Sequence, residues 1–263
     1  MDLSIITRDW SYDEDEEGQN VRKITGVDGR MKIQLRIRCG VVQWDVKGRP
    51  DGQKPHGFPS FLDYCASLLA RQAPGRDASE RPADRLNSDL VHELVEELFD
   101  YYRRSRALLH LTDYRGALDD VLHNLDILRM IREACPDETT VFNYDRYRPS
   151  LTADRARAEM LLHLRAGDPR RALDTLTTGI CDVEAFYAEY ELADGLAESP
   201  ERQMLVDLRR SLRAKHNVPL NDQELLQSLK AEQEIAIGRE NYEMAARLRD
   251  KISLLLQKTG PLK

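Results

Sequence analysis

The stretch RALLHLTDYRGALDDVL, residues 106–122, contains the end of one helix, a turn and the start of a second helix. Leucines at helical spacing mark the apolar face of the first helix, and a polar turn then interrupts that spacing. Asp113 lies where its side chain can cap the second helix, and Ala117 is small enough to let the two helices pack closely. The stretch therefore predicts an antiparallel helix pair.

A second stretch, EMLLHLRAGDPRRALDTL at residues 159–176, repeats this order. The two stretches align if two residues are inserted in the second turn, which gives Asp168 and Ala172 the same roles and makes His110 and His163 equivalent. The order of residues after the turn resembles the helix-turn-helix of tetratricopeptide-type repeats. The turn aspartates are 55 residues apart, however, whereas those repeats recur about every 34 residues. We expect two divergent helix pairs, and we attribute the matching histidines to the repeated structure.

Residues 20–47 have the alternation of a half-buried sheet instead of helical spacing. Apolar residues alternate with polar ones in two runs, which contain Ile33, Leu35 and Ile37 and then Val42, Trp44 and Val46. The pair Asp28-Gly29 is typical of a tight hairpin turn. We predict a three-stranded antiparallel meander, covered by the helix expected in FPSFLDYCASLLARQ, residues 58–72.

The predicted fold class is mainly α, and α+β overall. It combines a small N-terminal antiparallel β-meander, central antiparallel helix pairs and a C-terminal helical hairpin. The stretch APGRDASERPADRLN, with two prolines and dense charge, is typical of a linker, and no strand is expected after it. The four predicted regions are 1–72 (acidic N-terminus, meander and covering helix), 73–87 (linker), 88–217 (divergent repeat-like helical domain) and 221–258 (hairpin).

Composition and charge exclude several classes of protein. The 263 residues are 32% charged and 41% hydrophobic, with a formal net charge of −7, as in an ordinary soluble helical protein. The negative charge argues against a protein whose whole surface binds nucleic acid. No basic segment followed by an apolar run opens the chain, and no window approaches the ~20 apolar residues that span a membrane. We expect a cytoplasmic protein without membrane contact.

Clustered metal ligands and phosphate loops are missing from the sequence. No H-E-x-x-H motif, C-x-x-C pair or G-x-x-x-x-G-K-[ST] loop occurs. We expect mostly buried, reduced thiols at the four cysteines, which are Cys39, Cys65, Cys135 and Cys181. An enzyme site at His56 and Asp51, in the loop GRPDGQKPHG, is one alternative, although no nucleophile, base and orienting group occur at interpretable spacing. We expect no enzymatic activity, no cofactor and no metal.

The C-terminal stretch GRENYEMAARLRDKI, residues 238–252, places two adjacent alanines inside a helical pattern. With the helix before it, this stretch resembles the UVR motif, a helical hairpin of the excision-repair proteins UvrB and UvrC and of Clp-type ATPases. The matching residues are Leu229, Ala236, Ile237, Tyr242, Glu243, Ala245, Ala246, Leu248, Arg249, Asp250 and Ile252. Gln233 and Ile235 depart from the family pattern, and nothing upstream resembles helicase or nuclease machinery.

The resemblance implies an adaptor that docks a protein partner through the hairpin, either a UVR-containing protein or a second copy of the chain. It implies a link to Clp-type protein quality control or to excision repair. The candidate partner-binding residues are Tyr242, Ala245, Ala246, Leu248, Arg249, Asp250 and Ile252. We expect the first helix of the hairpin to cover one alanine and a partner helix to approach the other. The alternative is an ordinary hairpin docked on its own domain.

The meander supports a second function, the binding of nucleic acid. Residues 20–54 carry nine basic and three acidic side chains, a local charge of 9 − 3 = +6, and the candidate contacts are Lys32, Arg36 and Arg38. Trp44 can stack on a base, although it lies on the apolar side of its strand. The acidic segment DWSYDEDEE, residues 9–17, is expected to be solvated and can neutralise this face.

Overall fold

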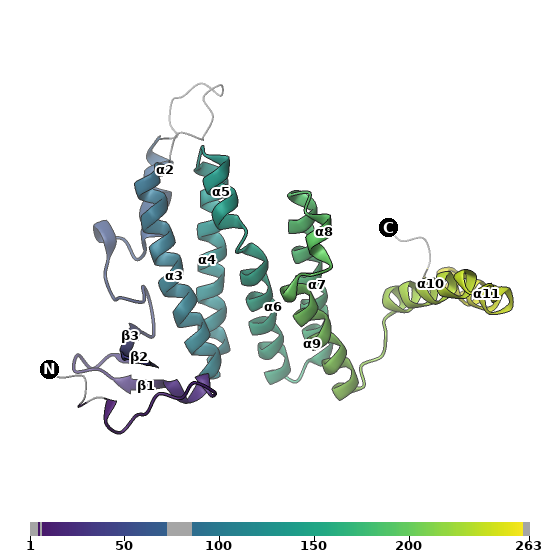
Figure 1. Ribbon diagram of the computed structural model, residues 1–263, viewed down its shortest axis with the longest axis horizontal. Coiled ribbons are helices and arrows are strands. Elements are labelled where there is room, and N and C mark those ends of the chain that lie inside the picture. The colour runs from purple at the N-terminus through teal and green to yellow at the C-terminus, as the bar shows by residue number, and fades with distance from the viewer. Residues whose placement is uncertain (1–4, 6, 73–85, 260–263) are drawn as a thin grey trace. The chain divides into compact units, whose positions relative to one another are not determined.

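The computed structural model describes residues 5, 7–72 and 86–259. The chain divides into two compact units, an N-terminal unit (Met1–Leu212) and a C-terminal unit (Arg213–Lys263), and each is described by itself (Figure 1). The predicted linker, residues 73–87, lies outside the described residues except for its last two.

Helices dominate both units. The N-terminal unit contains η1 (Glu17–Asn20), β1 (Val21–Thr25), β2 (Met31–Ile37), β3 (Gly40–Asp45), η2 (Pro55–Gly57), α2 (Phe61–Gln72), α3 (Ser88–His110), α4 (Tyr114–Ala134), α5 (Glu138–Asp145), α6 (Arg148–Arg165), α7 (Pro169–Glu189), α8 (Ala193–Leu196) and most of α9 (Pro200–His216). The C-terminal unit contains α10 (Asp222–Gly238) and α11 (Tyr242–Thr259). Within the described residues, every strand lies before residue 46, which confirms the predicted mainly α fold with a small N-terminal sheet.

The three strands form an antiparallel sheet in the order β1-β2-β3, as predicted. Val21 pairs with Leu35, and Ile33 pairs with Trp44. Because side chains alternate along a strand, the apolar residues of this register fall on one face, where Val21, Ile33 and Trp44 are buried. Gly29 has a φ of 75° in the β1–β2 loop, a conformation that favours glycine, so the predicted turn is confirmed.

Helix α3 and the start of α4 cover the apolar face of the sheet. One core cluster joins Val21, Ile33 and Trp44 of the sheet to Ala107, Leu108 and Ala117 of the helices. Helix α2 instead packs Phe61 and Cys65 into a separate core against α3 and α4. The prediction that residues 58–72 cover the sheet is therefore wrong. Helical spacing shows that α2 has an apolar face, but it does not show which other face it meets.

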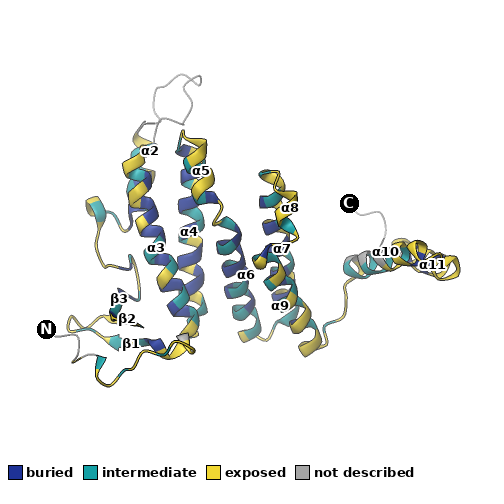
Figure 2. Ribbon diagram, in the orientation of Figure 1, coloured by how far each residue is buried: buried dark blue, intermediate teal, exposed yellow. Residues whose placement is uncertain are grey.

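Helices α3, α4, α6 and α7 lie side by side in that order (Figure 1), and they form the two predicted antiparallel pairs. Buried residues run along the inner faces of these helices (Figure 2). At Gly179 of α7 the two helices of the second pair approach closely. A Cβ atom there would lie 2.6 Å from the Ala156 Cβ of α6, so the crossing requires glycine.

The same turn joins the helices of both pairs. In the first turn the N–H groups of Leu111, Thr112 and Asp113 donate to the carbonyls of Ala107, Leu109 and Leu108. In the second, those of Ala166, Gly167 and Asp168 donate to Leu162, Leu164 and His163. Every partner is displaced by 55 residues, so neither turn has an insertion. His163 is therefore equivalent to Leu108, and the predicted match to His110 is wrong because the shared leucine-leucine-histidine letters are two residues out of register.

Each turn aspartate caps the helix that follows it. Asp113 Oδ1 accepts from Gly116 N at 3.2 Å, and Asp168 Oδ1 accepts from Arg171 N at 3.0 Å. The alanine four residues after each cap, Ala117 or Ala172, is fully buried. The predicted roles of these aspartates and alanines are confirmed.

Arg104 joins the sheet to the helix layer. Its guanidinium donates to both oxygens of Asp120 on α4, at 2.9 and 2.6 Å, and to the backbone carbonyl of Asp45 on β3, at 2.8 Å. Arg104 and Asp120 are both buried. Burial raises the pKa of Asp120, although Arg104 opposes that shift. The contact fixes the position of α3 against the sheet.

Glu97 is a second buried centre, on α3. Its carboxylate accepts from the backbone N–H groups of Phe61 (2.7 Å) and Leu62 (3.1 Å) at the start of α2, and it contacts His123 Nε2 and Arg49 Nε at 3.0 Å each. Burial would raise the pKa of Glu97, but the hydrogen bonds from His123, Phe61 and Leu62 together hold that pKa below its usual value. One carboxylate thus connects α2, α3, α4 and the loop after β3.

Candidate functional site: the C-terminal hairpin

Side chains cap both helices of the hairpin formed by α10 and α11. Asn221 Oδ1 accepts from Glu224 N at 2.7 Å, while the Glu224 carboxylate accepts from Asn221 N at 2.8 Å, which completes a capping box. Arg213 pairs with the same carboxylate. At the start of α11, Asn241 Oδ1 accepts from Met244 N at 3.2 Å. These caps compensate the backbone N–H groups that have no partner in the first turn of each helix.

The turn between α10 and α11 has the hydrogen bonds of the two turns in the N-terminal unit. The N–H groups of Arg239, Glu240 and Asn241 donate to the carbonyls of Ile235, Ile237 and Ala236. Asn241 takes the place of the capping aspartate, and Ala245 is the alanine four residues later. The local sequence therefore specifies the same helix pair a third time.

The two adjacent alanines have different environments. Ala245 is 7% exposed and packs with Ala236, Leu248 and Leu229 between the helices. Ala246 is exposed. The first helix of the hairpin thus covers Ala245 and leaves Ala246 open, since consecutive residues of a helix point about 100° apart.

The seven candidate partner-binding residues divide into an inner and an outer set. Ala245, Leu248 and Ile252 are buried and build the hairpin itself. The outer set is exposed and contains Tyr242, Ala246, Arg249 and Asp250. Because residues three and four apart share a helix face, Tyr242, Ala246 and Arg249 lie along one stripe of α11, which Ser253 and Leu256 continue. We call these five residues the outer stripe.

Among its described residues, the hairpin exposes more large apolar side chains than the core cluster between its helices contains. The exposed side chains are 42–68% exposed and belong to Ile235, Ile237, Tyr242, Met244, Leu254 and Leu256. Most of these residues were not predicted to be functional, although their helical positions relative to Ala245 and Leu248 predict their exposure. The core cluster between the helices has three buried residues and one partly buried leucine. Two short helices with so small a core gain stability from a further packing surface.

Arg249 and Asp250 pair with each other on the surface. The guanidinium donates to Asp250 Oδ1 from Nε at 3.2 Å and from Nη2 at 3.0 Å, and both side chains are 67% exposed. Gln233, which departs from the family pattern, donates from Nε2 to the Ala245 carbonyl at 3.4 Å and so bridges the two helices. Ile235, the second departure, is exposed. Both departures are compatible with the hairpin.

Comparison with known protein families finds a similarity that covers this hairpin. The family described as UVR, UvrB/uvrC motif, matches residues 223–258, which cover all but the first residue of α10 and all but the last residue of α11. No curated protein and no solved structure matches the chain. The C-terminal hairpin carries a UVR motif. The resemblance predicted from its residues is confirmed, and the N-terminal unit stays outside the match.

The three basic side chains predicted to contact nucleic acid have partners within the N-terminal unit. Lys32 pairs with Asp45 and with Asp28, the latter at 3.1 Å. Arg36 donates to backbone carbonyls, including those of Trp10 at 3.1 Å and Gly40 at 2.8 Å. Arg38 pairs with Glu14, and Trp44 is 3% exposed within the core. The three candidate contacts therefore have intramolecular partners, and Trp44 has no open face for stacking.

The acidic segment contacts the sheet, while most of its described residues are exposed, as predicted for a solvated segment. Asp13 N donates to Asn20 Oδ1 at 2.9 Å, and Trp10 Nε1 donates to Gln19 O at 3.0 Å. The guanidinium of Arg22 lies 3.9 Å from the centre of the Trp10 ring. The segment thus contacts two basic side chains of the meander: Arg22 through the Trp10 ring and Arg38 through Glu14.

The remaining candidates have structural surroundings. His56, in the loop suggested as an enzyme site, stacks on Tyr64 with ring centres 4.0 Å apart. Cys65 is buried, and burial raises its pKa to about 12, but Cys39 and Cys181 are exposed, so the prediction of mostly buried thiols is wrong. Over the described residues, no group of three His, Cys, Asp or Glu side chains is placed to hold a metal, and no helix has the length and apolarity to cross a membrane.

Proposed function

We propose that the chain is a non-enzymatic adaptor that docks a protein partner through the α10/α11 hairpin. The partner is a second UVR hairpin, in another protein or in a second copy of this chain. One observation carries the proposal: the residues that match the UVR motif form a hairpin whose outer stripe and neighbouring apolar side chains are exposed.

The composition of the outer stripe supports helix-to-helix docking. Ala246 and Ser253 are small and lie one turn apart from Arg249, while Tyr242 and Leu256 are larger and stand at the two ends. Small residues at the centre of a stripe let a second helix approach closely, and larger ones at the ends enclose it. Tyrosine and arginine are also the side chains that most often dominate binding energy at protein interfaces.

The motif suggests the pathway. UVR motifs occur in UvrB, UvrC and Clp-type proteins, so we propose a role in protein quality control or excision repair, in the cytoplasm. Intramolecular ion pairs and hydrogen bonds already involve Lys32, Arg36 and Arg38. This argues against nucleic-acid binding by the meander as the main function.

The test uses two substitutions in the outer stripe of the full chain. Ala246→Asp places a carboxylate at the proposed crossing, where desolvation would cost several kcal/mol of association free energy. Arg249→Ala should weaken association by ~1 to 3 kcal/mol. Self-association is measured by sedimentation of the purified chain, and association with other proteins by affinity capture followed by identification of UVR-containing partners.

Matched substitutions away from the stripe control for charge and size. Arg247→Ala removes an equally exposed arginine that pairs with Glu243. Ala185→Asp adds a carboxylate at an exposed alanine of α7. Circular dichroism should show unchanged helicity in all four variants. If the stripe variants fold and hold the same partners as the parent, the hairpin is only structural and the adaptor function is wrong.

A further inference from the structure

A groove of about 440 Å³ lies between α2 and α4 in the N-terminal unit. Helix α2 contributes Leu62, Ala66 and Leu69, which are spaced by four and three residues and so share one face of the helix. Met130 and Ala134 line the groove from α4. The lining residues of each helix extend over about two turns, or roughly 10 Å along the helix axis. The groove is therefore long enough to hold two turns of a third helix.

The floor of the groove is apolar and continuous with the core. Leu62, Leu69 and Met130 are partly buried and pack against the core cluster that α2 shares with α3 and α4, and Ala134 belongs to that cluster. Ala66, by contrast, is exposed and lies between the two leucines. A small residue at the centre of an apolar groove lets another helix approach closely. Methionine adapts its shape to different neighbours, so it suits the floor of a protein-binding groove.

Acidic side chains stand on both edges of the groove. Asp63 lies on the α2 edge, and Asp126 and Glu133 lie on the α4 edge, seven residues or about two turns apart. Asp119, which is exposed, extends the α4 edge by another seven residues. Arg129, the one basic residue among the described lining residues, pairs with Asp126 at 2.8 Å. Neither Asp63 nor Glu133 has an ion-pair partner in the part of the chain that the structure describes.

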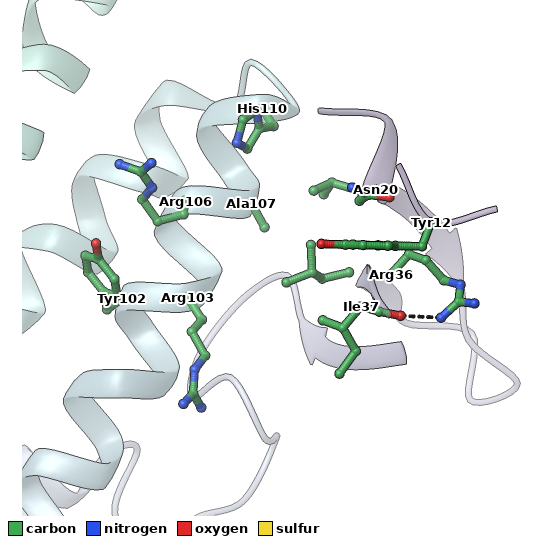
Figure 3. A pocket seen from close by; sticks show the side chains of 11 residues that line it. Tyr12, Asn20, Arg36, Ile37, Tyr102, Arg103, Arg106, Ala107 and His110 are labelled. Atoms are coloured by element: carbon green, nitrogen blue, oxygen red, sulfur yellow. Dashed lines mark hydrogen bonds between the residues drawn. The ribbon is translucent and has the colours of Figure 1, made fainter. Parts of the chain in front are cut away.

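A cavity between α3 and the sheet differs from the groove in this respect. It has a volume of about 390 Å³, and Arg103 and Arg106 are among its lining residues. Each of these arginines pairs with an aspartate at 3.7 Å, and their guanidinium groups are directed apart (Figure 3). The basic charge of α3 at that cavity is therefore compensated within the N-terminal unit. The carboxylates of Asp63 and Glu133 remain available to the basic side chains of a partner.

We propose that the α2/α4 groove docks an amphipathic helix of a partner protein, in which lysine or arginine borders a leucine-rich stripe. The apolar side chains of this helix, spaced by three and four residues, lie on the apolar floor. Basic side chains on one side of the stripe reach Asp63, and those on the other side reach Asp126 and Glu133. The same carboxylates repel an acidic helix. This docking is independent of the hairpin, because all of the lining residues belong to the N-terminal unit.

The test measures the binding of three designed peptides of about 14 residues, or roughly four helical turns, to the full chain. The first peptide has leucines at helical spacing and lysines on both sides of the leucine stripe. The second has glutamate in place of every lysine, and the third has the composition of the first in an order without an apolar stripe. We expect the first peptide to bind at least about tenfold more tightly than either of the others, because like charges oppose association and a helix without the stripe cannot cover the floor. Fluorescence anisotropy of the labelled peptides gives the dissociation constants.

Variants of the groove then locate the bound peptide. Asp126→Lys/Glu133→Lys should weaken binding of the lysine peptide at least about tenfold and strengthen binding of the glutamate peptide, because it reverses the charge of the α4 edge. Ala66→Tyr fills the centre of the groove and should also weaken binding of the lysine peptide. The Asp126 side chain is 49% exposed, and Glu133 and Ala66 are exposed, so circular dichroism should show an unchanged fold.

A double substitution with the same change of charge outside the groove is the control. Asp174→Lys/Asp207→Lys replaces two exposed carboxylates, each of which pairs with an arginine three or four residues away in its own helix, as Asp126 does. This control should retain the parental affinity for the lysine peptide. The proposal is wrong if the lysine peptide does not bind at about 100 µM, or if the glutamate or rearranged peptide binds as tightly. It is also wrong if the folded variant of the α4 edge binds the lysine peptide as tightly as the control does.

Discussion

The α6/α7 pair and the α10/α11 hairpin are built by the same local rules and end in different surroundings. Both have the same three backbone hydrogen bonds in the turn, a side-chain cap and an alanine four residues after the cap. In the N-terminal unit, α4 and α9 pack on the outer faces of the pair, and Leu205 of α9 reaches Gly179 of α7. In the hairpin, the outer faces are exposed.

The comparison separates what forms a helix pair from what the pair does. Turn, cap and alanine specify two antiparallel helices in both places. Whether the pair becomes an inner layer or a docking surface depends on the residues of its outer faces and on what covers them. The hairpin has large apolar side chains on its exposed faces, which is typical of a protein-binding surface.

The largest expected difference concerns one substitution made in each pair. Ala172→Asp would bury a carboxylate without a partner at a fully buried position, at a cost of about 5 kcal/mol or more of unfolding free energy. Ala246→Asp adds the same group at an exposed position and should change that free energy by less than about 0.5 kcal/mol. Urea unfolding followed by circular dichroism measures both. Equal effects would show that the hairpin is packed as tightly as the inner pairs.

Breaking an ion pair should also change the unfolding free energy much more in the N-terminal unit than in the hairpin. Arg104→Met leaves Asp120 buried without its partner and should cost about 3 to 5 kcal/mol of unfolding free energy. Arg249→Ala breaks an exposed pair and should change that free energy by less than about 0.5 kcal/mol. The double variant Arg104→Met/Asp120→Leu should recover most of the loss. A large loss in the double variant would mean that the contact of Arg104 with the Asp45 carbonyl dominates.

Local patterns in the sequence predicted the elements, and tertiary contacts decided the rest. The alternation around Ile33 and Trp44 predicted the meander, and the caps at Asp113 and Asp168 predicted the helix pairs, because these features depend on near neighbours. The covering helix was assigned wrongly, since every amphipathic helix offers an apolar face to any partner. The predicted equivalence of His110 and His163 was wrong. The alignment followed three matching letters and ignored that the two histidines lie at different distances from their capping aspartates.

The sites show the same division. The UVR resemblance and the covering of one alanine in the hairpin followed from residues close in sequence, Ala236 and Ala245. Tyr12 and Arg106, which are 94 residues apart, line one cavity between α3 and the sheet, and no local pattern predicts this arrangement. The hydrogen bond between the acidic segment and the sheet was not predicted for the same reason, because its donor is the side chain of Arg36.

Two glutamates that cap helices should respond differently to neutralisation. Glu97→Gln weakens buried hydrogen bonds to a charged acceptor and should cost about 2 to 3 kcal/mol of unfolding free energy at pH 7. Glu224→Gln should cost less than that, because glutamine also completes the capping box and the loss is confined to the half-buried pair with Arg213. Urea unfolding measures the first variant, and hydrogen exchange of α10 amides measures the second.

The pH dependence of the Glu97 effect has a definite sign. The folded-state pKa of Glu97 is lowered, so its contribution is fully present above the unfolded pKa of about 4.5 and is lost as pH falls through the lowered folded pKa. Asp120 and Asp154, whose pKa values burial raises, act in the opposite direction, so the difference between parent and variant is the quantity to measure. A difference that stays constant from pH 7 to pH 3 would contradict the role of the charge.

The smallest expected effect lies in the turns themselves. Gly167 has a φ of 76°, and Glu240, at the equivalent position of the hairpin turn, has a φ of 56°. A side chain in this left-handed region costs ~1 kcal/mol, because its Cβ crowds the following carbonyl oxygen. Glu240→Gly should therefore stabilise the hairpin by about 0.5 to 1 kcal/mol, and Gly167→Ala should destabilise the N-terminal unit by about 1 kcal/mol. A Cβ at Gly167 would meet no atom within 4 Å, so its effect would be purely conformational.

Hydrogen exchange of the amides of α10 and α11 measures the change in Glu240→Gly, and urea unfolding measures the change in Gly167→Ala. Faster exchange in Glu240→Gly would show that the carboxylate of Glu240 contributes more than its backbone conformation costs, and the equivalence of the two turns would then hold for geometry but not for energy.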